Sequence, residues 1–430
     1  MNNSKYPFRT TTLGEILDRI LGGGTPPRNI EDYYNGSIPW ATVKDLDGAF
    51  YKSDTIEHIS NLGLINSSAN LIPEGAMIIA TRMGLGRGFI NKSPISINQD
   101  LKAVFPKKDI DLCFLMYWYL SKSAEIEAMG VGSTVKGITL SDLKKLKLEL
   151  PEEEWEQQKI AEILTTVDNA IEKTEALIEK CKNVKQGMTQ DLLTKGIDEH
   201  GNIRSEETHE FKDSPIGRIP QGWKAEFLGK YVDIKHGYAF SGEFFTEIPN
   251  DNILLTPGNF SVDGNLDFSI NTKYFTGPIP QQYLLENGDL LIVMTDLTKE
   301  MNILGNTVIL YNEKNVLHNQ RIGKIQIKDK NQIDKQYLLQ VINSQFCKKI
   351  IKDTATGTTV RHTSPKKICN AIVPICSYEE QCRIAEVIAR CENKIQSENN
   401  FLLKFQNQKL GLMQDLLTGK VRVPLEEATG

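Results

Sequence analysis

The stretch Glu156–Thr194 decides the fold because the chain contains it twice; it reads EQQKIAEILTTVDNAIEKTEALIEKCKNVKQGMTQDLLT. The second copy, Glu380–Thr418, reads EQCRIAEVIARCENKIQSENNFLLKFQNQKLGLMQDLLT, at an offset of 224 residues (380 − 156) without a gap. Of the 39 paired positions 16 are identical, whereas about two or three would match by chance. The chain therefore consists of two copies of one unit, each a variable domain followed by a helix.

Each copy has the start, stop and periodicity of one long helix. Pro151 and the acidic run after it suit a first helical turn, and Lys195-Gly196 suits a helix end. Ser377-x-x-Glu380 is typical of a capping box, and the second copy ends at Gly419. About 40 residues at ~1.5 Å each predict helices of roughly 60 Å.

The apolar residues of the first copy recur every seven positions in three columns, a stripe wider than a two-stranded coiled coil needs. We expect the two helices to pair antiparallel and to leave apolar surface for other helices. The alternative is two separate amphipathic helices, each packed on its own domain. The residues assigned to helix pairing or partner docking are Ile160, Leu164, Val167, Ile171, Leu177, Ile178, Ile384, Ile388, Ile395, Leu402, Phe405 and Leu416.

A variable segment of about 150–180 residues precedes each helix, and the two segments share only a skeleton. The strand-like stretch 73–80 matches 286–293, Asn98-Gln99 matches Asn319-Gln320, and the turn at 132–136 matches the one at 357–361. Short strands, glycine-rich turns and a few helices predict an α+β domain. A shared scaffold with divergent loops indicates two recognition domains with different targets.

Composition and charge set broad limits. With 430 residues the chain should form two or more domains. The net charge of −5 is concentrated in residues 151–200, which carry 6 Lys and Arg against 12 Asp and Glu, so a local basic face on each domain is compatible with it. The 7 cysteines are odd in number and contain no C-x-x-C, which indicates reduced thiols. Without a long apolar run or a secretion signal, we expect a cytoplasmic protein that contacts no membrane.

In the first variable domain, the loop that best suits contact with a ligand is 81–88, directly after an apolar strand. Its glycines permit close backbone approach and its arginines supply charge. A plain surface turn is the alternative for this loop, and Trp40 can equally be a core residue. The candidate contacts of this domain are Arg28, Trp40, Thr42, Lys44, Arg82, Gly84, Arg87, Thr134 and Lys136.

In the second variable domain, the candidates occupy corresponding stretches and are of types that read base edges or bind phosphates. His362 on its own would more often be an ordinary surface histidine. Its place after Arg361 favours a contact with the ligand only slightly more. The doubled Asn-Gln pair fits a structural hydrogen-bonding role as well as a base contact. The candidate contacts are Tyr238, Phe240, Ser241, Asn259, Thr295, Asp296, Lys299, Thr359, Arg361 and His362.

Motifs for catalysis are weak. Thr25-Pro-Pro-Arg28 only faintly resembles the Asn/Asp-Pro-Pro-aromatic motif of amino-methyltransferases, since both outer residues differ. Glu392-x-Lys394 has nuclease-like spacing but lies on a heptad helix, and the 6 histidines show no metal-ligand spacing. We therefore expect a non-catalytic protein without a bound metal or cofactor.

The ordered set of motifs resembles the specificity (S) subunit of Type I restriction–modification systems over essentially the whole chain. It comprises Gly22-Gly-Gly-Thr-Pro26 with Ile38-Pro-Trp40, the Gly-x-Thr-Val-basic turns, the Glu-Gln start of each helix and the Asp-Leu-Leu-Thr exits. The match implies four segments: a target-recognition domain at 1–150, a spacer helix at 151–197, a second recognition domain at 198–375, and a second spacer helix with the tail at 376–430.

The resemblance also implies a function. The two globular domains would be separated by the antiparallel helices, which act as a coiled-coil spacer with an internal pseudo-two-fold repeat. Each domain would read one half of a bipartite, asymmetric site in double-stranded DNA. The helices would dock two methyltransferase (M) subunits and, through them, the restriction (R) subunits, with S-adenosylmethionine, Mg and ATP on those partners only. The alternative from another class is a coiled-coil scaffold without DNA specificity.

Overall fold

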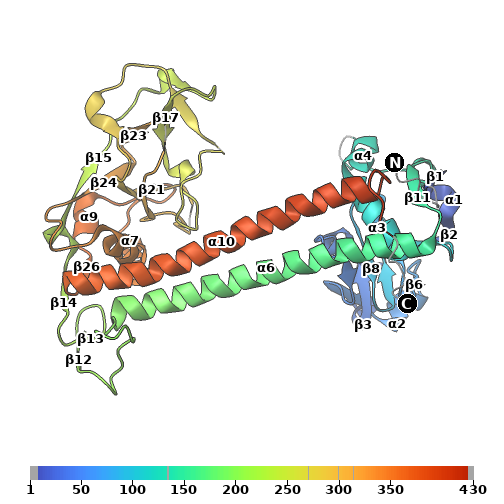
Figure 1. Ribbon diagram of the computed structural model, residues 1–430, viewed down its shortest axis with the longest axis horizontal. Helices are drawn as coiled ribbons and strands as arrows, with labels where there is room; N and C mark the ends of the chain where they lie inside the picture. Colours follow the sequence, from blue (N-terminus) through green and yellow to red (C-terminus); the bar gives the residue numbers. More distant parts are fainter. Residues whose placement is uncertain (1–7, 133–134, 270, 299, 313, 425–430) are drawn as a thin grey trace. The chain divides into compact units, whose positions relative to one another are not determined.

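The computed structural model describes residues 8–132, 135–269, 271–298, 300–312 and 314–424. Its contacts divide the chain into two compact units. Unit 1 comprises Met1–Leu177 with Glu398–Gly430, and unit 2 comprises Ile178–Ser397. The division falls within both long helices, α6 (Glu154–Thr194) and α10 (Tyr378–Leu416), so each unit contains part of each helix (Figure 1). The prediction of two long helices at the repeated stretches is confirmed.

Unit 1 has two main sheets. In the first, β2 (Leu17–Gly22), β10 (Leu101–Pro106), β7 (Met77–Ala80), β8 (Gly88–Asn91) and β4 (Tyr51–Lys52) lie in that order. In the second, the order is β5 (Glu57–Ile59), β3 (Tyr34–Ala41), β9 (Ile95–Ile97) and β6 (Leu71–Ile72), and β3 runs parallel to β9. The remaining elements are β1 (Phe8–Thr12) paired with β11 (Lys147–Pro151), α1 (Leu13–Ile16), α2 (Asn61–Ile65), α3 (Leu112–Ser121), α4 (Ser123–Met129), α5 (Leu140–Lys144), η1 (Glu31–Tyr33) and η2 (Val43–Asp45).

Unit 2 repeats this topology. One sheet orders β15 (Val232–His236), β24 (Ile322–Ile327), β20 (Leu290–Val293) and β22 (Thr307–Ile309). The other orders β16 (Phe245–Thr246), β18 (Lys273–Phe275), β17 (Asn252–Leu255), β23 (Asn315–His318) and β19 (Leu284–Leu285), with β17 parallel to β23. The remaining elements are β12 (Phe211–Lys212), β13 (Ile219–Pro220), β14 (Lys224–Phe227), β21 (Thr295–Asp296), β25 (Arg361–His362), β26 (Ile372–Ile375), α7 (Lys335–Asn343), α8 (Gln345–Asp353), α9 (Pro365–Cys369), η3 (Leu228–Lys230), η4 (Gly242–Phe244), η5 (Pro257–Asn259) and η6 (Gln281–Tyr283).

The two units therefore share one α+β framework. The orders β2-β10-β7-β8 and β5-β3-β9-β6 of unit 1 correspond to β15-β24-β20-β22 and β18-β17-β23-β19 of unit 2. The predicted duplication of an α+β domain is confirmed at the level of strand order, although the loops between the strands differ in sequence.

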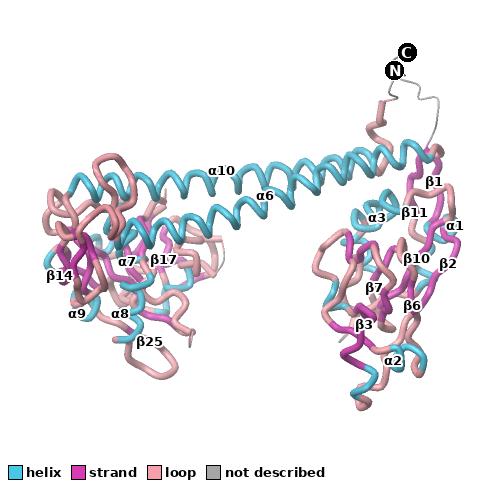
Figure 2. Tube along the Cα trace, turned by 90° about the horizontal axis from the view of Figure 1, so that it is seen from below, coloured by secondary structure: helices cyan, strands magenta, loops and turns pink. Residues whose placement is uncertain are grey.

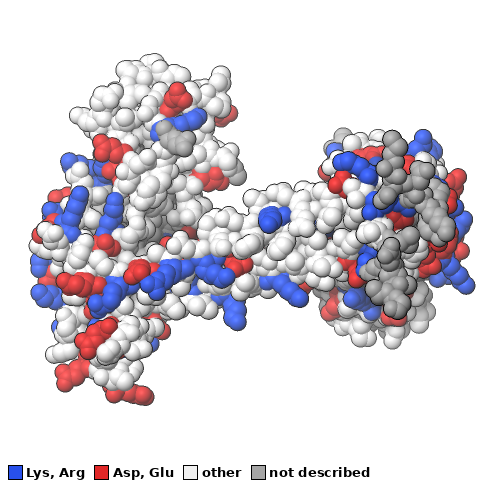
Figure 3. All heavy atoms as spheres, in the orientation of Figure 1, with Lys and Arg blue, Asp and Glu red and all other residues white. Residues whose placement is uncertain are grey.

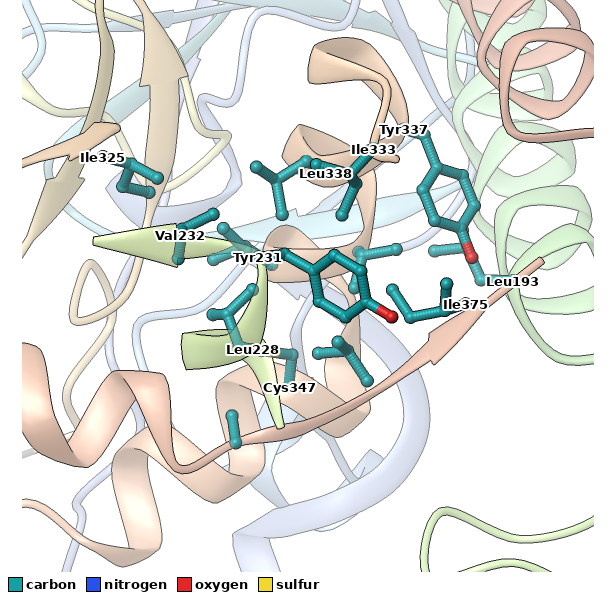
Figure 4. Close-up of a cluster of buried hydrophobic side chains, with 14 of the residues drawn as sticks. Leu193, Leu228, Tyr231, Val232, Ile325, Ile333, Tyr337, Leu338, Cys347 and Ile375 are labelled. Carbon is teal, nitrogen blue, oxygen red and sulfur yellow. The ribbon is translucent and has the colours of Figure 1, made fainter. Parts of the chain in front are cut away.

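In each unit, α6 and α10 lie side by side (Figure 1 and Figure 2), and the sequence colours of Figure 1 show that they are antiparallel. In unit 1, Ile160 and Leu164 of α6 share a core with Met413 and Leu416 of α10, and an ion pair of 2.6 Å joins Asp168 to Lys409. In unit 2, the end of α6 packs on the start of α10 within the core of that unit, and Lys185 pairs with Glu392 at 2.6 Å. The close-up in Figure 4 shows Leu193 of α6 beside Tyr337 and Ile375 of that core.

The apolar positions predicted for helix pairing or docking differ in burial. Leu177 is 39% exposed. Those that are buried are Ile160, Leu164, Val167, Ile178, Ile384, Ile388 and Leu416, and those that are partly buried are Ile171, Ile395, Leu402 and Phe405. Most of these side chains thus pack within the chain itself, against the other helix or against the domain of their own unit.

The glutamine of each Glu-Gln start ties its helix to the domain before it. The Gln157 side chain accepts a hydrogen bond from the Asp111 amide (2.8 Å) and donates to the carbonyl oxygens of Asp109 and Pro151. Gln381 does the same with the Asp334 amide (2.8 Å) and the carbonyl oxygens of Gln332 and Cys376. Since both side chains are buried, these bonds hold each helix at a fixed place on its domain.

The glutamate of each start contacts the segment that follows the other helix. Glu156, 1% exposed, accepts hydrogen bonds from Arg422 at 2.7 and 2.5 Å. Glu380 accepts from Arg204, from the Ile197 amide (3.1 Å) and from the indole of Trp223 (3.1 Å). Each carboxylate is therefore paired and hydrogen-bonded, as a buried charge must be.

This anchoring predicts opposite effects of two glycine-to-alanine changes in unit 2. Gly196 has φ +66°, and a Cβ there would lie 2.3 Å from Glu380 Oε1 and 2.4 Å from the Trp223 ring. We expect Gly196→Ala to lower the free energy of unfolding by more than about 1 kcal/mol. Gly187→Ala on α6, where a Cβ meets open space, should raise it by ~0.5–1 kcal/mol.

Urea unfolding of the two variants beside the unchanged chain checks this prediction. Equal midpoints for both variants would show that the contact of Gly196 with Glu380 does not constrain the fold.

Candidate nucleic-acid interface

In unit 1, the loop after β7 lies against the turn that carries Lys136. Arg82 and Gly137 form an isolated antiparallel bridge, and the Met83 amide donates to the carbonyl oxygen of Lys136 at 3.2 Å. Arg82, Gly84, Arg87 and Lys136 are all exposed. The structure thus brings together two stretches that the sequence placed more than 40 residues apart, and their side chains face solvent.

Buried groups of the domain support the same loop. Asp100 lies 3.8 Å from the guanidinium of Arg82, whose side chain is 57% exposed, and Asn98 and Asp100 hydrogen-bond to one another. Gly84 (φ +93°) and Gly86 (φ +76°) have positive φ, and a Cβ on Gly86 would meet Ser123 at 2.6 Å. Glycine is therefore required to keep this loop close to the domain.

Unit 2 repeats the arrangement with other side chains. Strand β21 pairs with β25, so that Thr295 faces His362 and Asp296 faces Arg361. Thr295 Oγ1 and His362 Nδ1 share a hydrogen bond of 3.0 Å, and Arg361 donates to the carbonyl oxygen of Gly357 at 2.6 Å. His362 and Thr359 are exposed and Arg361 is half-buried. The doubled turn of the sequence thus occupies the same place in both units.

Asp296 organises the unit 2 loop and is not exposed to a ligand. It is fully buried and accepts hydrogen bonds from the amides of Thr298, Ile303 and Leu304. The loop in unit 1 that corresponds to it has no such carboxylate, because Arg82 and Met83 follow its strand. Thr134 and Lys299, both predicted contacts, lie outside the described residues.

A second group of candidates in unit 1 surrounds Glu57. Arg28 Nη1 lies 2.7 Å from one carboxylate oxygen of Glu57 and Lys44 Nζ lies 3.0 Å from the other. The hydrogen bond from Arg28, with that from Lys44, lowers the pKa of Glu57 from its ordinary value against the effect of burial. The carboxylate is therefore ionised at neutral pH and orients two predicted DNA contacts.

Besides Asp296, five predicted contacts are buried, so the prediction of a DNA contact does not fit the structure at these six residues. The Trp40 indole, 1% exposed, donates to the carbonyl oxygen of Gly24. Thr42 is the N-cap of the short helix η2, and the Asn259 side chain accepts a hydrogen bond from the amide of Thr256, the N-cap of η5, at 2.9 Å; both residues are buried. The other two are Phe240 and Thr295, at 7% and 4% exposed.

The remaining unit 2 candidates are accessible. Tyr238 is 41% exposed and contacts Phe240 edge-on and Tyr283 at a tilt, each with ring centroids 5.1 Å apart. Ser241 is exposed and donates to Glu243 at 2.9 Å. Tyr238 thus presents an aromatic face beside Asn319, with which it forms a parallel bridge.

Charge on the drawn face is mixed, with Lys and Arg interspersed among Asp and Glu rather than gathered in one basic patch (Figure 3). Among the described residues, no group of three or more His, Cys, Asp or Glu could hold a metal ion. In the same part of the chain, no helix combines the length and the apolar character that crossing a membrane requires. Recognition would therefore depend on the individual loops.

Sequence reasoning missed Glu57 and Asp100, whose carboxylates lie beside the candidate contacts Arg28, Lys44 and Arg82. Their role depends on which strands are neighbours, and this becomes visible only in the register of the sheets.

The family model for the Type I restriction modification DNA specificity domain matches residues 7–183 and again residues 220–404. The chain belongs to this family. Two copies of the domain coincide with the duplicated framework described above, so the expected family, the α+β class and the internal repeat are confirmed. The chain is accordingly a specificity subunit, a recognition component rather than an enzyme.

Individual relatives agree with this assignment. The chain is 28% identical over 424 residues to the Type I restriction enzyme MjaVIII specificity subunit of Methanocaldococcus jannaschii, covering 97% of this chain and 93% of that protein. It is 27% identical over 427 residues to the putative MjaX specificity subunit of the same organism, covering 98% and 89%.

Solved structures share the fold. The crystal structure of a Type I restriction–modification S subunit from M. genitalium matches with a TM-score of 0.57 at 16% identity, over 97% of this chain and 98% of that one. A chain from a structural study of complex assembly and conformational transition of the Type I system matches with a TM-score of 0.59 at 15% identity, over 96% and 98%.

The buried His318 beneath Tyr283 predicts a pH-dependent stability of unit 2. Burial lowers the pKa of His318 from its ordinary value of 6.5, and its Nε2–H donates to the carbonyl oxygen of Ile322 at 2.8 Å. The unfolded chain therefore binds a proton near pH 6.5 that the folded chain does not accept until lower pH. Stability is full above that pH and falls as the pH drops from about 6.5 toward the lower folded pKa.

We expect the free energy of unfolding of His318→Gln to fall less between pH 7.5 and pH 5.5 than that of the unchanged chain. Urea unfolding at both pH values measures this difference. His200→Gln, at an exposed position, is the matched control. If the pH-dependence of His318→Gln equals that of the control, the burial of His318 is not its cause.

Proposed function

We propose that each unit of this specificity subunit reads one half of a bipartite, asymmetric sequence in double-stranded DNA. The observation that carries the proposal is the duplicated pairing of a strand-end loop with a Gly-x-Thr-Val-basic turn, around Arg82 in unit 1 and around Thr295 in unit 2. The framework is the same and the exposed side chains differ, as two readers of different sequences require.

The exposed chemistry supports DNA as the ligand. Arg82, Arg87 and Lys136 in unit 1 are of the types that bind guanine edges and phosphates, and Thr359 and His362 in unit 2 offer further polar contacts. Gly84 in the unit 1 loop and Gly357 in the unit 2 turn let the backbone approach a ligand closely. A scaffold without DNA specificity would not need two divergent polar loops on one framework.

The long helices are proposed to set the distance between the half-sites and to dock two M subunits, which in turn bind the R subunits. Leu177 on α6 and Phe401 on α10 occupy equivalent positions of the repeat and are 39% and 48% exposed. Leu403 and Leu410 of α10 are more exposed still. These side chains are apolar surface that packing within the chain leaves uncovered, and two equivalent helices support two docked partners.

Catalytic chemistry is proposed to reside on the partners. S-adenosylmethionine, Mg and ATP would bind the M and R subunits and not this chain. The complex would act on DNA in the cytoplasm, where its substrate lies.

Two arginine changes should affect different half-sites. In the complex with M subunits, we expect Arg82→Ala to reduce base discrimination in one half-site by ~1–3 kcal/mol and to leave the other unchanged. Arg361→Ala should weaken only the other half-site. Arg9→Ala, also on unit 1 but outside the loop, is the control.

Selection of bound sequences from a random DNA pool, followed by footprinting, measures both half-sites at once. Two protected stretches separated by an unread gap are expected for the unchanged complex. Binding without any sequence preference would instead support the scaffold function, and equal loss at both half-sites in Arg82→Ala would exclude base reading by Arg82.

Docking of M subunits has a separate test. We expect the double change Leu177→Gln and Phe401→Gln to weaken M binding at least tenfold, because it places polar groups in an apolar contact. Ile248→Gln, at a position 76% exposed in unit 2, is the control and should bind M normally. Analytical ultracentrifugation gives the stoichiometry, expected to be two M subunits per chain, and unchanged binding by the double variant would place the docking surface elsewhere.

A further inference from the structure

Glu57 lies at the centre of an ionic triad on the surface of unit 1. Its two carboxylate oxygens are divided between Arg28 Nη1 at 2.7 Å and Lys44 Nζ at 3.0 Å. The side chain of Glu57 is 22% exposed, while those of Arg28 and Lys44 are 57% and 66% exposed. A sheltered carboxylate thus holds two cations that both face solvent.

The guanidinium of Arg28 is also fixed by an aromatic platform. Its central carbon lies 4.8 Å from the Tyr34 ring centroid and 5.0 Å from that of Trp40. Tyr34 donates to the carbonyl oxygen of Pro26 at 2.5 Å, and the buried Trp40 donates to that of Gly24 at 3.1 Å, so neither ring is free to move. These two cation–π contacts together with the carboxylate limit the orientations open to the guanidinium.

The arrangement opens onto a surface hollow. Arg28, Tyr34, Glu57 and His58 line a pocket of about 250 Å³, and the neighbouring Ile56 is 67% exposed. Among the described residues, the Arg28 guanidinium donates its hydrogen bond from Nη1 to Glu57. Its other nitrogens therefore retain donors for a ligand that approaches from solvent.

At the positions of unit 2 that correspond to the triad, the residues are different. Glu57 is the partner of Trp40 in the β3–β5 ladder, and Lys273 is the partner of Leu254 in the corresponding β17–β18 ladder. Trp40 and Leu254 are equivalent because each occupies the same register in the parallel pair with β9 or β23. The carboxylate of unit 1 thus corresponds to a lysine of unit 2.

Arg28 and Lys44 have no charged counterparts in unit 2 either. The stretch around Trp40 matches unit 2 at an offset of 214 residues (254 − 40), which places Gly242 opposite Arg28 and Gly258 opposite Lys44. The triad is therefore not needed to build the framework, since the other copy of that framework forms without it. The presence of these charges in one copy only indicates a role in what unit 1 recognises.

We propose that Glu57 is a positioning residue for specificity, which holds Arg28 to read the O6 and N7 acceptors of a guanine in the half-site of unit 1. Lys44 contacts a nearby phosphate. This inference rests on the proposed function and names the base and the side chains for one of its half-sites. Arginine donates two parallel hydrogen bonds to the major-groove edge of guanine, and this requires a guanidinium held in a defined plane.

The charge of Glu57 makes the proposal distinguishable from a general role in affinity. A carboxylate beside DNA repels phosphates and lowers binding to any sequence. With Glu57 ionised the triad carries a net charge of +1, and with glutamine it would carry +2. Removing the charge should therefore improve binding to unrelated DNA while it releases Arg28 from its orientation.

The test uses the complex of the full chain with M subunits and compares Glu57→Gln, Arg28→Ala and Arg28→Lys with Glu74→Gln, an exposed glutamate of the same unit. Bound sequences are selected from a pool randomised in both half-sites, and binding to unrelated DNA is titrated with salt. In Glu57→Gln we expect a guanine preference at one position to fall roughly tenfold, with the other half-site unchanged. Binding to unrelated DNA should strengthen, with a salt slope steeper by ~0.9 for one additional phosphate contact.

Arg28→Ala and Arg28→Lys should lose the preference at the same position, because lysine lacks the planar pair of donors. An unchanged preference in Glu57→Gln, or equal loss at both half-sites, would overturn the proposal. So would loss at a position where the unchanged complex does not select guanine. If the unchanged complex selects no sequence at all, the proposed function itself fails, and that outcome is distinct from these.

Discussion

A buried carboxylate at the start of each long helix is the constraint on which the structure depends. Glu156 in unit 1 and Glu380 in unit 2 each bind an arginine from the segment that follows the other helix, Arg422 and Arg204 respectively. An unpaired charge at that depth would cost several kcal/mol, so each helix start requires the exit of its partner to be in place. The adjacent Gln157 and Gln381 fasten the same turns to the domains that precede them. Four residues, two in each copy, thus couple helix pairing to domain orientation.

This coupling separates what must stay constant from what can vary. The strand orders and the helix anchors are the same in both units, whereas the loops at the open edges of the sheets carry unrelated side chains. Unit 1 exposes Arg28 and Lys44 around Glu57, and unit 2 exposes Tyr238, at another place on the framework, on a cluster of aromatic rings. A rigid framework that does not depend on its exposed loops can change its ligand without losing its fold.

The sequence predicted the helices and the duplication because both are written in local patterns, a heptad period and a gapless repeat. It also predicted DNA contact for both the loop of Arg82 and the turn of Lys136, but it did not predict that the two are paired. It failed at Thr42 and Asn259, which have side chains suited to base contacts but take part in capping boxes of short helices inside the domains. A residue type that hydrogen-bonds bases also hydrogen-bonds backbone amides, and only burial distinguishes the two uses.

Residues such as Glu57 escape sequence reading for a related reason. Its position opposite Trp40 follows from strand register, which no local pattern encodes, and its counterpart Lys273 lies at a different sequence offset from the residues around it. Once the register is known, the two copies of the framework act as controls for one another. A charge present at one copy and reversed at the other contributes nothing to the shared fold, so its contribution must be sought in the ligand. The internal repeat therefore identifies candidate specificity residues from a single chain, because it provides two solutions to the same folding problem.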